Sequence, residues 1–253
     1  MRNNIIIYAL AGVIAVIGIV ALYAGSGGDV DEIIEKIDEL YRSKTSYAEM
    51  EMEIITPHWE RTLAMKAWTE GMEKTFIRIT APAKEKGVST LRIGNEMWNY
   101  LPKTNKVIKV PPSMMMSSWM GSDFTNDDLV SEFTFTEDYH FHTISADSIR
   151  DDRILIEAIP KEDRPIVWGK VLLYIQKSDT LPVREEFYDE KGRLMRVMKF
   201  QEVKNFDGRR IPSVTILIPQ DEEGNKTILQ YRKVDFNRDI SGDIFSLRHL
   251  RNR

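Results

Sequence analysis

The chain has 253 residues, 42% hydrophobic and 29% charged, a globular composition that excludes a disordered polypeptide. Its formal net charge is −4, and an acidic protein gains no binding free energy from counterion release on a polyphosphate, so nucleic acid is not an expected partner. The absence of cysteine removes disulfides, thiolate catalysis, cysteine metal sites and a lipidated N-terminal cysteine.

The first element is an uncharged apolar segment, residues 5–24. As a helix of about twenty residues it would be roughly 30 Å long, the thickness of a bilayer core. Arg2 precedes it and acidic residues follow it, which predicts export of the remaining chain. A buried core helix is disfavoured because the segment has no polar face. Cleaved signal and retained anchor both stay open, so residues 1–28 are predicted to be a signal or membrane anchor plus linker, and 29–253 the folded domain.

A helix is predicted to follow, from Asp29 to about Ser43. Asp29 can cap it, with Glu32 as the partner three residues on. Its apolar residues recur at helical spacing and form one stripe that should pack on an apolar surface. The stripe consists of Ile33, Ile34, Ile37, Leu40 and Tyr41.

From residue 49 onward the apolar period changes to two. Residues 49–54 alternate acids with apolar side chains, which indicates a half-buried strand. Turn residues separate further predicted strands at 60–69, 72–80, 88–93, 96–101, 106–110, 133–144, 153–159, 167–177, 182–189, 194–204, 211–218 and 226–236. So many strands with short connections predict an antiparallel meander that curls or closes, and no linker divides it.

Residues 111–130 interrupt the strands. Thr125 with Asp128 can cap a short helix here. The segment carries an unusual apolar group: Met114, Met115, Met116, Trp119, Met120 and Phe124. These residues could form a lid over an apolar cavity, because methionine adapts to ligands of variable shape. Alternatively the segment is an irregular loop that plugs a hole in the core, and composition alone favours this second interpretation.

The remaining polar and aromatic candidates are weaker. Trp59, Trp68, Trp98 and Tyr100 lie on predicted strands, where aromatic residues more often form core than contact a ligand, and Trp168 is assigned to packing. His140 and His142 lie two apart and could share a metal, but no third ligand accompanies them. Glu49, Glu51 and Glu53 are expected on a solvated strand face. No catalytic or phosphate-binding motif is present, so no catalytic residue, metal or cofactor is expected.

Residues 86–130 resemble the outer-membrane lipoprotein-sorting protein family, the LolA-like group. The resemblance rests on a glycine-initiated strand, a hairpin with Trp98, Tyr100 and Pro102, the run Met120 to Phe124, and the acidic helix start at Asp127 and Asp128. It implies a mainly β fold with a few helices: a strongly curved antiparallel sheet, or half-open barrel, covered on its concave face by helices. It also raises the lid interpretation above the plug.

The resemblance implies a periplasmic carrier or holder of lipid or lipoprotein acyl chains, without enzymatic activity. The expected lipid-binding residues are Met114, Met115, Met116, Trp119, Met120, Phe124, Trp98, Tyr100 and Trp68. The expected partners are the acyl chains, an inner-membrane transporter and an acceptor at the outer membrane, with the protein itself a monomer. Two alternatives stay open: a membrane-anchored envelope-stress sensor of the same fold, and an enzyme acting on lipids or glycans.

Overall fold

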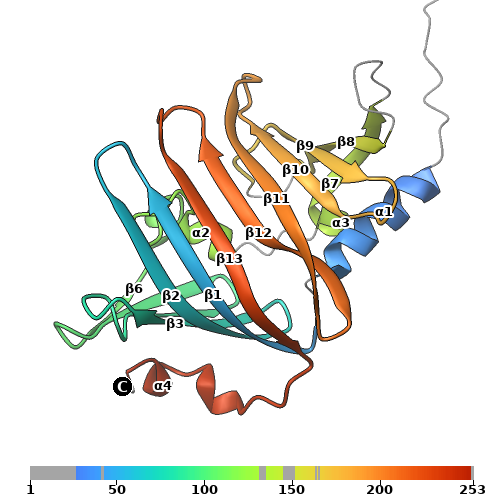
Figure 1. Ribbon diagram of the computed structural model, residues 1–253. Helices are drawn as coiled ribbons and strands as arrows, with labels where there is room; N and C mark the ends of the chain where they lie inside the picture. Colours follow the sequence, from blue (N-terminus) through green and yellow to red (C-terminus); the bar gives the residue numbers. More distant parts are fainter. Residues whose placement is uncertain are drawn as a thin grey trace, which may run out of the picture.

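Two meanders of antiparallel strands join into one curved sheet in the computed structural model (Figure 1). The structure describes residues 27–40, 43–130, 135–144, 152–162, 164 and 166–251. Its thirteen strands follow the order β6-β5-β4-β3-β2-β1-β13-β12-β11-β10-β9-β8-β7, so the first and last strands pair at the centre. Their bounds are β1 (Thr45–Ile55), β2 (Glu60–Glu70), β3 (Lys74–Ala81), β4 (Ser89–Ile93), β5 (Glu96–Leu101), β6 (Lys106–Lys109), β7 (Tyr139–Ile144), β8 (Arg153–Pro160), β9 (Lys170–Gln176), β10 (Pro182–Tyr188), β11 (Leu194–Phe206), β12 (Arg209–Pro219) and β13 (Lys226–Phe236).

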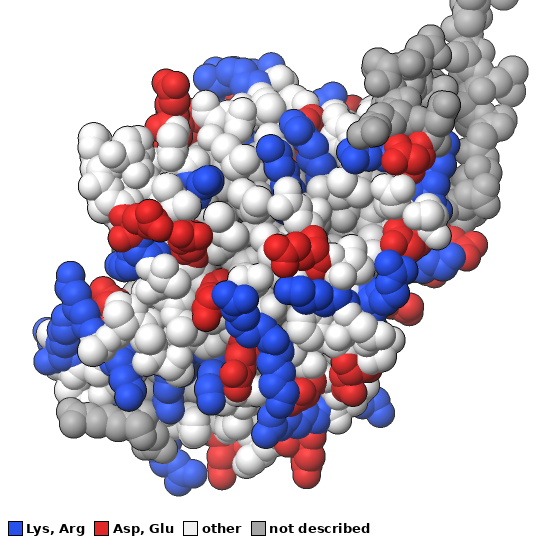
Figure 2. All heavy atoms as spheres, viewed as in Figure 1, with Lys and Arg blue, Asp and Glu red and all other residues white. Residues whose placement is uncertain are grey.

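The alternation of side chains gives the sheet one apolar and one charged face. On β1, Met50, Met52 and Ile54 are buried against the inner face. The glutamates between them point outward, where Glu49 lies 3.8 Å from Lys66 and Glu51 pairs with Arg232. Charged side chains of both signs accordingly intermingle over the surface in Figure 2. The predicted solvated strand face is confirmed.

Helices cover the concave face, as the resemblance implies. The longest, α1 (Gly27–Leu40), lays Ile34 and Ile37 on the inner side of β8 to β10. Two short helices, α2 (Asn126–Val130) and α3 (Phe135–Asp138), also lie on this face. The other short elements are η1 (Pro112–Met114), which precedes α2, and η2 (Gly242–Ile244) and α4 (Leu247–Leu250), which lie on the outer face. Because α1 begins at Gly27, Asp29 lies inside its first turn, and the prediction of Asp29 as the capping residue is wrong. Tyr41 lies outside the described residues.

The C-terminal segment packs on the opposite, outer face of the sheet. Phe245 and Leu250 are buried there against Phe76, Leu91 and Tyr100. Arg78 on β3 donates a hydrogen bond of 3.0 Å to the backbone carbonyl of His249 and so fastens α4 to the strand. This apolar cluster closes the outer side of β3 to β5.

Part of one predicted strand is helical. Residues 133–144 were expected to be extended throughout, but α3 occupies Phe135–Asp138 and β7 begins at Tyr139. The reason is a cap from a distant part of the chain: the Asp38 carboxylate on α1 accepts hydrogen bonds from the backbone amides of Phe135 and Thr136, at 3.3 and 3.2 Å. Such a cap stabilises the first turn of a helix.

The predicted export segment, residues 5–24, lies outside the described residues. Within the part of the chain that the structure describes, no helix has the length and apolar character needed to span a bilayer.

Candidate functional site

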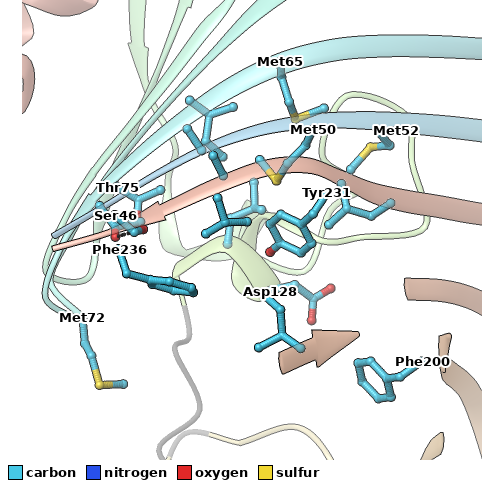
Figure 3. A pocket seen from close by; sticks show the side chains of 18 of the residues that line it. Ser46, Met50, Met52, Met65, Met72, Thr75, Asp128, Phe200, Tyr231 and Phe236 are labelled. Carbon is cyan, nitrogen blue, oxygen red and sulfur yellow. Dashed lines mark hydrogen bonds between the residues drawn. The ribbon is translucent and has the colours of Figure 1, made fainter. Parts of the chain in front are cut away.

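An apolar cavity of about 420 Å³ lies between the inner face of the sheet and the elements that cover it (Figure 3). Sheet residues from β1, β2, β3, β12 and β13 form most of its wall. Ile37 of α1, Trp119 and Leu129 of the segment 111–130, and Phe135 of α3 form the covering side. A space of this size falls within the roughly 300–1,000 Å³ of small-molecule sites.

Methionines give this cavity its character. Met50, Met52, Met65 and Met72 all line it, the first three from β1 and β2 and the last from the turn that follows β2. Unbranched thioether side chains can change rotamer at low cost, so the wall can adapt to guests of different shape. The period-two alternation of residues 49–54 in the sequence already predicts that Met50 and Met52 lie on the core face of the sheet.

The segment 111–130 is held in place by a compact turn at Met120 to Phe124. Met120 and Gly121 both have positive φ, 54° and 74°. Gly121 adopts this conformation without strain, whereas it is uncommon for a residue with a side chain such as Met120. The Ser122 hydroxyl donates to the Trp119 carbonyl at 2.7 Å. The Asp123 carboxylate accepts a hydrogen bond of 2.7 Å from Thr227 on β13. These contacts bring Trp119 and Phe124 into the core above the cavity.

The helix that closes this segment is also firmly built. Thr125 and Asp128 form the predicted cap: the Thr125 amide donates to the Asp128 carboxylate at 2.8 Å, and the Asp128 amide donates to the Thr125 hydroxyl at 3.1 Å. The Asn126 side-chain amide donates to the carbonyls of Met114 and Ser117, at 3.0 and 3.1 Å. Because these bonds lie within the segment, it is expected to move as one body.

A buried ion pair joins this body to the far half of the sheet. Arg196 on β11 donates two hydrogen bonds to the Asp128 carboxylate, of 2.7 and 2.8 Å, and the side chains are only 6% and 9% exposed. The guanidinium is also stacked over Trp168 and Phe187, with 4.5 and 4.3 Å to the ring centroids. Bidentate geometry and aromatic stacking both favour arginine here. Sequence analysis missed this contact, because nothing local marks residues 68 positions apart as partners.

Glu185 on β10 is a buried carboxylate at the same side of the cavity. Burial raises its pKa from an ordinary value of 4.5 to about 7, although the nearby Arg196 charge opposes the shift. Since the folded pKa exceeds the unfolded one, the folded protein keeps a proton between about pH 4.5 and 7 that the unfolded chain releases. This contribution to stability is complete below pH 4.5 and is lost as the pH rises through 7.

Replacing Glu185 by glutamine should therefore flatten the pH dependence of stability. The wild-type free energy of unfolding is expected to fall by up to roughly 3 kcal/mol between pH 5 and 8 from this group, and the Glu185→Gln protein should lack that slope. Urea denaturation at four pH values measures it. Glu51→Gln, on the solvated outer face, is the matched control and should keep the wild-type slope. An unchanged slope in Glu185→Gln would contradict the assignment.

The predicted binding residues divide into three groups. Trp119 lines the cavity and is 2% exposed, its indole nitrogen donating to the Thr90 hydroxyl at 3.1 Å. Phe124, Met115 and Met120 pack in the same core cluster, while Met114 and Met116 are 50% and 44% exposed on the outside of the segment. The aromatic residues of the strands point away from the cavity and belong to the outer cluster under the C-terminal segment: Trp68, Trp98 and Tyr100.

The described residues contain no group of three or more histidine and acidic side chains arranged to hold a metal. His140 and His142 stand on the exposed side of β7, an edge strand. Trp168 packs against Phe187, with 5.2 Å between ring centroids. The residues that line the site are mostly apolar, and one of its carboxylates, that of Asp128, pairs with Arg196.

Comparison with solved structures identifies this architecture. A putative outer membrane lipoprotein-sorting protein domain from Vibrio parahaemolyticus matches with a TM-score of 0.75 and 22% identity, over 88% of this chain and 98% of that one. A DUF1329 family protein from Desulfovibrio piger matches with a TM-score of 0.76 and 22% identity, over 87% and 97%. A LolA superfamily protein from Nitrosomonas europaea matches with 0.71 and 26%, over 86% and 97%.

The fold is therefore the LolA-like fold of outer-membrane lipoprotein-sorting domains, which confirms the resemblance seen in residues 86–130. At the level of sequence, a protein family described as "Uncharacterized protein" matches residues 71–252, and the chain belongs to that family. A comparison with curated proteins gives no match.

Proposed function

We propose that this protein is a periplasmic carrier that holds the acyl chains of a lipid or lipoprotein in the cavity. The observation that carries the proposal is the 420 Å³ space lined by four methionines on the inner face of the sheet. The fold supports it, because similar structures include a domain described as an outer membrane lipoprotein-sorting protein. Carriage rather than catalysis fits a site that offers apolar surface.

The energetics favour an acyl guest. Each buried methylene contributes about 0.8 kcal/mol, so a long chain can provide on the order of 10 kcal/mol before the costs of binding. The segment 111–130 serves as the lid in this proposal, with Trp119 facing the guest. Met115, Met120 and Phe124 support Trp119 from the surrounding core, and exposed Met114 and Met116 meet the guest at entry. Release requires the lid to swing away as one body.

The partners follow from the same proposal. An inner-membrane transporter would load the guest and an acceptor at the outer membrane would receive it, with the carrier acting as a monomer. The segment 5–24 would export the chain and either be cleaved or keep it at the inner membrane.

A cavity-filling substitution tests the proposal. Ala67 on β2 is buried and lines the cavity, so Ala67→Phe should occupy the guest's space and weaken binding of an uncharged fluorescent acyl probe at least about tenfold. Ala64 is on the same strand but faces outward, and Ala64→Phe is the matched control. Binding is measured by fluorescence titration, with circular dichroism as the check on folding.

Two results would contradict the proposal. The first is equal probe binding by the Ala67→Phe and Ala64→Phe proteins. The second is protein purified from cells without detergent that carries no acyl chains by mass spectrometry and does not bind the probe. Capture of a membrane regulatory protein together with that second result would favour the envelope-stress sensor instead.

A further inference from the structure

A second hollow, of about 820 Å³, opens at the end of the acyl cavity. Met72 contributes to the walls of both, and α1 supplies Ile37 to the cavity and Leu40 to the hollow. Figure 3 shows Met72 at one end of the cavity beside Phe236, with Phe200 at the other end. The described residues that line the hollow include Lys44, Asp179, Arg209 and Arg210.

The two spaces differ in charge. Among the described residues that line the acyl cavity, three are acidic (Asp38, Asp128 and Glu185) and none is lysine, arginine or histidine. Among the described residues that line the hollow, four are cationic (Lys36, Lys44, Arg209 and Arg210) and two are acidic (Glu39 and Asp179). A negatively charged group is repelled from the interior, where charge is also costly to desolvate, and is attracted to the hollow.

One cation of the hollow contacts a residue that lines the acyl cavity, and two others have charge available for an anion. The Arg209 guanidinium lies over the Phe236 ring at 4.3 Å, and Phe236 itself lines the acyl cavity. Arg210 lies 3.3 Å from Asp179, an exposed pair that screens only part of its charge. Lys44 is exposed, and within the described parts of the chain its ammonium group has no ion-pair partner.

We propose that the guest is an anionic amphiphile, with its phosphate or carboxylate headgroup at Lys44, Arg209 and Arg210 and its acyl tail in the cavity. This rests on the proposed function and adds to it a ligand class and an orientation. In the bound state the tail extends from Met72 toward Trp119. Lipid headgroup and free phosphate share the chemistry that these cations recognise, so the experiment must separate them.

The test compares two ligands with the same palmitoyl chain: lysophosphatidic acid, which carries a phosphate, and the uncharged monopalmitoylglycerol. The full-length protein is expected to bind the phosphate-bearing lipid about tenfold more tightly, as expected of two partly exposed ion pairs. The preference should shrink as salt rises. The variants Lys44→Gln and Lys44→Gln/Arg210→Gln should lose it stepwise and bind monopalmitoylglycerol as the wild type does.

The control variant is Lys66→Gln/Arg232→Gln on the outer face, which removes two cations of similar exposure and should keep the preference. Equal affinity for both lipids would overturn the headgroup site and leave the acyl carrier intact. Binding of neither lipid would overturn the carrier itself. Inorganic phosphate should fail to displace the lipid at equal concentration; displacement would show a phosphate site that is independent of the tail.

Discussion

The Arg196→Met protein is expected to lose about 3–5 kcal/mol of unfolding free energy, because the substitution leaves the Asp128 carboxylate buried without its cation. The Asp128 side chain is 9% exposed and faces β11 from the lid, so water cannot replace the lost partner while the lid stays closed. The rings of Trp168 and Phe187, each of which contacts the guanidinium, would lose that cation as well. Both effects act on the same contact and should appear together as one large loss of unfolding free energy.

Urea denaturation at pH 7 measures this loss. Arg232→Met is the matched control, because Arg232 also pairs with a carboxylate, that of Glu51. Both of these side chains are about half exposed, so the expected cost in unfolding free energy is below about 1 kcal/mol. Adding Asp128→Leu to Arg196→Met should restore much of the stability, because no charge then remains buried. Similar losses for Arg196→Met and Arg232→Met would show that the buried pair contributes no more than a surface pair.

The Trp119→Ala protein is also expected to lose about 3–5 kcal/mol, the usual cost of emptying a buried aromatic site. Trp119 is 2% exposed, touches the apolar core and donates its indole hydrogen to Thr90. Its removal would join the vacated volume to the acyl cavity. The Trp119→Ala protein, with its enlarged cavity, should therefore still bind an acyl probe but unfold at a lower denaturant concentration than the wild type.

Trp59 provides the matched control for this substitution. It is 45% exposed near the hairpin between β1 and β2, with Arg61 over its ring at 5.4 Å. Trp59→Ala should cost about 0.5–1 kcal/mol, mostly through that cation–π contact. Equal losses at the two positions would mean that Trp119 is not part of the core.

Local sequence patterns were sufficient to predict most of the sheet. Alternation in residues 49–54 gave the correct inner and outer faces of β1, and the Thr125 and Asp128 cap was found from spacing alone. Contacts between distant residues were not predictable in this way. Asp38 capping α3 and Arg196 binding Asp128 depend on how elements meet in space, and neither leaves a local pattern.

In the candidate site, too, some features followed from local sequence patterns and others depended on contacts between distant residues. The methionine-rich composition of residues 114–120 drew attention to the lid, but the cavity wall also uses Met50, Met65 and Met72, which look like ordinary core residues in the sequence. The strand aromatics show the converse. Trp98 and Tyr100 matched the motif of the resemblance, yet strand parity directs them to the outer cluster with Phe245. A period-two pattern separates the two faces of a sheet but does not show which face lines the cavity.

The two edge strands of this sheet, β6 and β7, stand at opposite ends of the strand order and are not paired with each other. A closed cylinder has a girth fixed by its strand number and stagger, so a thicker content would break backbone hydrogen bonds. In this open sheet, the separation of the two edge strands is not fixed by pairing between them. Small changes of twist distributed over twelve strand-to-strand pairings can widen or narrow the trough while every ladder stays intact. Under the proposed function, one scaffold can thus accommodate a guest with one tail or several without breaking a main-chain hydrogen bond.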